Sequence, residues 1–135
     1  MGSQLKELRR YSPGQLAYLG DSVYELYVRE YLLSQSFSTP GELNHKALDF
    51  VSAPKQARAL QGISPLLSEE ELDFVRRGRN VKTGNIPRRA SYAEYRQATG
   101  LECLLGALYV EGKNQRIREI MEACIASLEQ NNEME

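Results

Sequence analysis

Apolar residues recur at three- and four-residue steps along most of the chain, which is the spacing of helices with one buried face. Ser12 before Pro13 and Thr39 before Pro40 are helix-start signals, because the cap residue precedes a proline whose missing N–H is not needed there. No segment alternates apolar and polar residues as a half-buried strand does. The pattern predicts an all-α protein, with helices over about 12–34, 39–50, 52–62, 68–78 and 91–112 and a last one from 117 to the polar tail.

The first helix should bury one stripe of side chains, which we place at Leu16, Leu19, Val23, Leu26 and Leu33. The segment from 78 to 87 contains two glycines and a proline without a sustained period, and is predicted to be a loop. At 135 residues the chain fits one domain. We assign residues 1–129 to that domain and residues 130–135 to a disordered acidic tail.

Charge is balanced overall but unevenly placed. The 17 basic and 18 acidic residues argue against binding a polyanion through bulk charge alone. Between 74 and 93, however, there are six cations and no acid. A solvated face is the ordinary explanation of such a run, but Asn80, Thr83 and Asn85 add side chains that hydrogen-bond phosphate oxygens. We therefore predict phosphate contacts by this segment, with Lys55 extending the basic surface.

Two acids stand in apolar helical surroundings, Asp21 in YLGDSVYEL and Glu102 in TGLECLLGALYV. Burying an isolated carboxylate is costly unless its charge is compensated, and a divalent cation between the two acids would compensate both. Two alternatives stay open at this point: Asp21 as a solvated surface acid, and Glu102 paired with Arg96 or another buried cation. Glu25, one turn beyond Asp21, is interpreted as a solvated acid.

Cys103 and Cys124 have neither the short spacing of a zinc site nor a disulfide framework, so we expect reduced, buried thiols and a reducing compartment. The chain has no run of about 18 apolar residues, and its first residues lack the apolar run of a signal peptide. We expect a soluble protein of the cytoplasm with no membrane contact.

The segments LAYLGDSVYELYVR and ECLLGALYV resemble the endonuclease domain of the ribonuclease III family. The likeness is greater to the short mini-ribonuclease III branch, through NHKALDFVSAPKQA, RRGRNVKTGNIP and YRQATGLECLLG. These segments cover nearly the whole chain in the right order. The longer enzymes carry further acids where this sequence has Gly14, Ala17 and Thr99, which leaves the number of protein-held metal ions open, and mini-ribonuclease III shares these differences.

The resemblance implies an all-helical homodimer that cuts both strands of double-stranded RNA, leaving 5′ phosphates and 3′ hydroxyls. It implies Asp21 and Glu102 as catalytic carboxylates that bind magnesium. It also implies large-subunit (23S) ribosomal RNA precursors as substrate, a ribosomal protein as helper, and a plastid stroma location if the source is a plant. The residues we expect to contact RNA are Arg76, Arg77, Arg79, Asn80, Lys82, Thr83, Arg88 and Lys55.

One alternative is that this chain has the same fold but no catalytic activity, and acts as an RNA-binding or ribosome-associated protein. A third possibility is a purely structural helical dimer whose basic loop contacts an acidic protein. Asp21 and Glu102 discriminate against both, because neither needs acids at these apolar positions.

Overall fold

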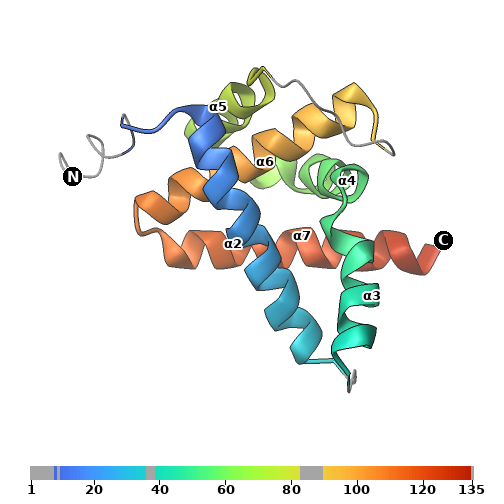
Figure 1. The fold of residues 1–135 in the computed structure, drawn as a ribbon. Coiled ribbons are helices and arrows are strands. Elements are labelled where there is room, and N and C mark those ends of the chain that lie inside the picture. Colours follow the sequence, from blue (N-terminus) through green and yellow to red (C-terminus); the bar gives the residue numbers. More distant parts are fainter. Residues whose placement is uncertain (1–7, 9, 36–38, 83–89, 135) are drawn as a thin grey trace.

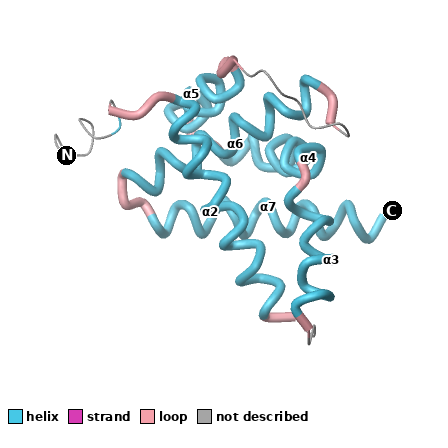
Figure 2. The backbone as a smooth tube through the Cα atoms, in the orientation of Figure 1, coloured by secondary structure: helices cyan, strands magenta, loops and turns pink. Residues whose placement is uncertain are grey.

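The computed structural model describes residues 8, 10–35, 39–82 and 90–134 (Figures 1 and 2). These residues contain helices and no strand, so the predicted all-α class is confirmed. In chain order the elements are α2 (Pro13–Leu33), α3 (Pro40–Val51), α4 (Ala53–Ile63), the 3₁₀ turn η1 (Ser64–Leu66), α5 (Glu69–Arg79), α6 (Tyr92–Val110) and α7 (Asn114–Met134).

The helix starts follow the sequence signals. Ser12, Ser68 and Ser91 each accept a hydrogen bond from the backbone N–H three residues on, and the side chain at that third position accepts from the cap N–H in return. Thr39 and Ser52 cap α3 and α4 through their hydroxyls in the same way, each before a proline in the first turn. Local side-chain chemistry therefore accounts for where these helices begin.

The buried stripe of α2 differs from the prediction. Leu26 and Leu33 are 63% and 70% exposed, whereas Tyr24, Val28 and Leu32 are almost fully buried. The buried face of α2 is rotated about the helix axis relative to the predicted one. It follows steps of four residues from Leu16, through Gly20, Tyr24, Val28 and Leu32. Placing Leu26 and Leu33 in the core was therefore wrong, and both lie on an outward face.

Helix α6 is the centre of the fold. It packs against α2, α4, α5 and α7, and its contact with α2, which crosses it in Figure 1, is the most extensive in the molecule. Its C-terminal part is buried on nearly all sides, from Leu101 to Leu108, which is typical of a core helix. Glu102 lies on this buried part. The position of this acid is therefore not that of an ordinary charged residue on a helix surface.

Both cysteines are free and buried, as predicted. Burial raises the pKa of the Cys103 thiol to about 11 and that of Cys124 to about 12. Thiolate is the reactive form, so both side chains behave as small apolar core residues.

Helix α7 extends beyond the limit we assigned to the domain, since it continues through 130–134. Two long-range hydrogen bonds tie its end to the rest of the fold. The Tyr31 hydroxyl donates to Oε2 of Glu129 (2.6 Å), and Nζ of Lys55 donates to Oδ1 of Asn132 (3.1 Å). The sequence pattern missed this extension because polar contacts rather than apolar periodicity carry it. None of the described helices is long and apolar enough to cross a membrane.

Candidate active site

Two glycines set the contact between α2 and α6. A Cβ atom at Gly20 would lie 1.7 Å from the carbonyl oxygen of Glu102, and one at Gly106 would lie 1.9 Å from the carbonyl oxygen of Leu16. Both distances are far inside van der Waals contact, so only glycine fits at either position. The two backbones touch at this crossing, and the crossing brings Asp21, next to Gly20, against Glu102.

The Asp21 and Glu102 carboxyl groups face each other within hydrogen-bonding reach. Asp21 is exposed to solvent, and Glu102 lies deeper. Burial, followed by the hydrogen bond and the charge of Asp21, raises the pKa of Glu102 to about 9, with the Glu25 carboxylate adding to the effect. No positive charge among the described residues contributes to this shift. Two acids without a compensating charge are the condition under which a cation or a proton is held between them.

The pairing of Glu102 with Arg96, left open above, is wrong. The Arg96 guanidinium turns toward α5, where Nε donates to the carbonyl oxygen of Arg79 (2.7 Å) and Nη2 donates to Oδ1 of Asn80 (3.1 Å). Besides Asp21, the structure gives Glu102 a neutral partner: Nε2 of Gln56 donates to its Oε2 at 3.4 Å. Arg96 instead fixes the end of α5 and the first residue after it.

The acid pair fits a magnesium ion, which one or two carboxylates can hold while waters and a substrate phosphate fill the remaining positions. The described residues contain no group of three or more histidines, cysteines or acids that could enclose a metal by themselves. Glu25 forms an ion pair with Arg29 (3.9 Å) on the helix surface, in keeping with a solvated acid. Asp21 and Glu102 are therefore the protein ligands available to such an ion.

The raised pKa of Glu102 predicts how stability depends on pH without metal. The folded protein keeps this proton up to about pH 9, whereas the unfolded chain releases it near the ordinary value of 4.5. The stabilisation by the proton is complete below the lower pKa and is lost as pH rises through the higher one. At pH 8 in EDTA, Glu102→Gln should therefore melt about 3 °C or more above the wild type.

Circular dichroism melts at pH 5 and pH 8 test this expectation. The advantage of Glu102→Gln should shrink at pH 5, where wild-type Glu102 is neutral in the folded protein and about one quarter neutral when unfolded. Equal melting temperatures of the two proteins at pH 8 would mean that Glu102 carries no burial cost.

The described residues among those predicted to contact RNA do not form one cluster. Arg76 and Arg77 lie on the exposed side of α5, where both pair with Asp73, and Arg77 also lies over the Phe74 ring. The Asn80 side chain is engaged by Arg96. Lys55 points toward Asn132 at the far end of α7, which does not favour its predicted role at the basic segment.

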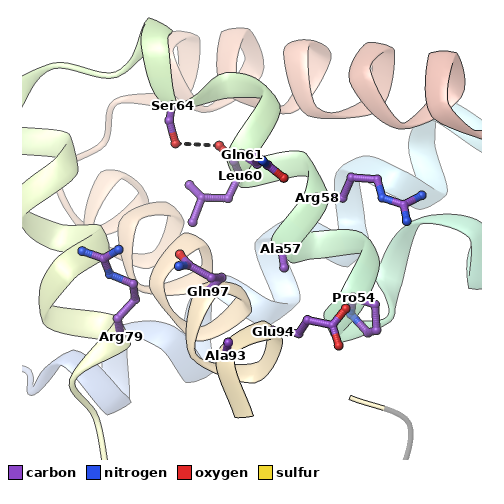
Figure 3. Close-up of a pocket in the computed structure, with 10 residues that line it drawn as sticks. All are labelled: Pro54, Ala57, Arg58, Leu60, Gln61, Ser64, Arg79, Ala93, Glu94 and Gln97. Atoms are coloured by element: carbon purple, nitrogen blue, oxygen red, sulfur yellow. Dashed lines mark hydrogen bonds between the residues drawn. The ribbon is translucent and has the colours of Figure 1, made fainter. Parts of the chain in front are cut away.

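Arg79 ends α5 and lines a groove of about 550 Å³ between α4, α5 and α6 (Figure 3). In the close-up, Arg79 and Gln97 stand on the α5 and α6 side of the groove, across from Gln61 of α4. Neither Asp21 nor Glu102 belongs to its lining. Lys82 is exposed three residues beyond Arg79, whereas Thr83 and Arg88 lie outside the described residues.

Sequence reasoning missed Gln56 as a partner of Glu102, and it considered Arg96 only for a contact that the structure does not form. The signal for Gln56 was present, because Gln56, Ala59, Leu60 and Ile63 follow one buried stripe of α4 and only the first is polar. Gln56 is thus a polar residue among buried apolar ones, as Glu102 is on α6. No comparable signal marked the actual partners of Arg96, because they are a backbone carbonyl and a side-chain amide at the end of α5.

Residues 14–113, which contain both acids and both crossing glycines, match the Ribonuclease III domain family. The chain therefore belongs to the ribonuclease III family, a class of endoribonucleases. Its relatives there are proteins named mini-ribonuclease 3. That of Symbiobacterium thermophilum is 44% identical over 117 residues, covering 87% of this chain and 90% of the relative. That of Brevibacillus brevis is 42% identical, covering 87% and 88%.

A crystal structure of a protein from Fusobacterium nucleatum has the same fold, with a TM-score of 0.78 and 35% identity over 89% of this chain and 96% of that one. The resemblance to mini-ribonuclease III drawn from the sequence is confirmed.

Proposed function

We propose that this ribonuclease III-type endoribonuclease hydrolyses double-stranded RNA with magnesium held by Asp21 and Glu102. The observation that carries the proposal is the pair of carboxyl groups brought face to face by the glycine crossing of α2 and α6, with Gln56 as the neutral partner of Glu102. The products expected from the family are 5′-phosphate and 3′-hydroxyl ends.

We infer different tasks for the two acids from how deeply each is buried. Asp21 is exposed, so it reaches both the ion and a phosphate that approaches from solvent. Glu102 would bind the ion from the protein side, because its neighbours on α6 are buried. When bound, the ion would lower the pKa of a water and neutralise charge that develops on the phosphate and the leaving oxygen.

The first test is incubation of the purified protein with a radiolabelled RNA duplex, with and without magnesium. Cleavage that requires magnesium supports the proposal. Tight binding without cleavage, also in the presence of ribosomal proteins, would favour the non-catalytic RNA-binding protein instead.

The end of α5 should supply phosphate contacts. Each phosphate contact that is removed lowers the slope of log affinity against log salt concentration by about one. Arg79→Ala and Lys82→Ala should therefore each weaken binding to a duplex and flatten this slope by up to about one contact. Fluorescence anisotropy of a labelled duplex at four salt concentrations measures both quantities.

Lys113→Ala is the control for these variants, since Lys113 follows α6 and pairs with Glu111 (3.2 Å). Its salt slope should equal that of the wild type. An unchanged slope for Arg79→Ala and Lys82→Ala would remove this end of α5 from the RNA interface.

We propose that the protein works as a homodimer, and an outward face of α2 supports this. Tyr18, Leu26 and Leu33 are 85%, 63% and 70% exposed along this face, and Leu48 of α3 is 61% exposed. Apolar side chains gathered in this way are typical of a subunit interface. Sedimentation equilibrium should give twice the chain mass of 15.3 kDa, and Tyr18→Asp should shift the protein toward monomer. A wild type that sediments as a monomer at micromolar concentration would contradict the dimer.

We further propose large-subunit ribosomal RNA precursors as substrate, a ribosomal protein as helper and the cytoplasm as location. The support for these three is the likeness to mini-ribonuclease III. Primer extension on precursor RNA incubated with the protein, with and without large-subunit ribosomal proteins, tests the first two. Fractionation of cells of the source tests the third.

A further inference from the structure

Gln56 is the polar side chain that the described core buries, with 3% of its surface exposed. Its Nε2 donates two hydrogen bonds, to the carbonyl oxygen of Val51 (3.1 Å) and to Oε2 of Glu102 (3.4 Å). Turning the carboxamide over would place its oxygen against both of these acceptors, so the hydrogen bonds fix its orientation. Gln56 thus links the junction of α3 and α4 to the acid on α6.

The other end of the same carboxamide is unsatisfied. Oε1 of Gln56 is buried and has no hydrogen-bond partner within the described part of the chain. A buried acceptor without a partner costs stability, and an apolar side chain of similar length would avoid that cost. Packing alone therefore does not explain glutamine here, whereas a requirement for its N–H groups does.

We propose that Gln56 is a positioning residue for Glu102: its Nε2 holds one carboxylate oxygen of Glu102 so that the group faces Asp21 and a divalent cation. The inference rests on the proposed function, because it assigns Gln56 to the same metal site. The same Nε2 also donates to the Val51 carbonyl oxygen, so the donor that faces the carboxylate is fixed. A group that hydrogen-bonds to a metal ligand orients that ligand and thereby changes the affinity of the site for the metal.

Gln56→Met tests the proposal, because methionine keeps the length of the side chain and removes its donors. Binding of Mn²⁺ is measured by electron paramagnetic resonance in the absence of RNA, and cleavage is measured in magnesium. We expect Mn²⁺ affinity to fall by about ten- to a hundredfold. At subsaturating magnesium, kcat should fall by a similar factor while KM for the duplex stays within about twofold.

Ile63→Ala is the matched control, since Ile63 is buried on the same helix at 1% exposure. This variant should melt at a lower temperature than the wild type and bind Mn²⁺ as tightly. Unchanged Mn²⁺ affinity in folded Gln56→Met would overturn the proposal, and so would an equal loss of affinity in Ile63→Ala.

A second measurement uses the wild type and so does not depend on the fold of a variant. In ¹⁵N-labelled protein, the side-chain amide of Gln56 should shift on addition of magnesium along the same saturation curve as the backbone amide of Glu102. A Gln56 amide that does not move while Glu102 saturates would overturn the role of Gln56 and leave the proposed function intact. A wild type that binds no Mn²⁺ and cuts no duplex would overturn both.

Discussion

Glu102→Gln should lower the rate of duplex cleavage by at least about a hundredfold and leave the protein folded. The amide keeps the size of the side chain but removes the charge that, in the proposed site, would bind a cation opposite Asp21, so the stabilisation of developing phosphate charge would be lost. Single-turnover cleavage of a radiolabelled duplex in magnesium measures the rate, and circular dichroism at the assay temperature verifies the fold.

Asp21→Asn should lose activity to a similar extent, since the proposed site has the two acids hold the same ion. Glu30→Gln is the control, because Glu30 is an exposed acid on the same helix and pairs with Arg118 instead (3.7 Å). Its cleavage rate should equal that of the wild type. Wild-type cleavage by folded Glu102→Gln would show that the acid pair is not the catalytic centre.

Gly106→Ala should destabilise the protein strongly, as should the same change at Gly20. The added methyl would lie 1.9 Å from the Leu16 carbonyl oxygen, a backbone atom that moves only if the whole of α2 moves. We expect a loss of about 3 kcal/mol or more in the free energy of unfolding, at the upper end for overpacked sites. Urea denaturation followed by circular dichroism measures it.

Gly14→Ala is the matched change on α2. A methyl at Gly14 meets nothing closer than a Val81 methyl at 3.6 Å, and helical glycine carries an entropy cost. This variant should be as stable as the wild type or gain about 0.5 kcal/mol. Comparable losses in Gly14→Ala and Gly106→Ala would mean that the crossing is not tightly packed.

The fold class and the helix starts could be predicted from the sequence because both depend on local chemistry. Ser12, Thr39 and Ser68 determine where α2, α3 and α5 begin through hydrogen bonds within three residues. The prediction of which α2 side chains are buried was partly wrong. Leu26 and Leu33 fit a periodic stripe by eye, yet the side that is buried depends on where α6 lies, which is not local information.

The acids of the site could be recognised from their apolar neighbours, because an uncompensated carboxylate in such a helix is expensive. Their mutual placement could not be derived, since it depends on contacts such as that between Gly20 and the Glu102 carbonyl, 82 positions apart. The same holds for Arg96. Its charge suggested an ion pair with Glu102, but its two hydrogen bonds to Arg79 and Asn80 satisfy it on the opposite side.

The glycine crossing has a consequence for how this protein tolerates change. Since main-chain atoms are in contact there, the separation of the two helix axes does not depend on how the surrounding leucines fill their space. Redesign of the interior at Leu104 or Leu108 should therefore alter the melting temperature well before it alters the span available to a cation. The geometry of the proposed metal site is therefore expected to tolerate substitutions in the core that supports it.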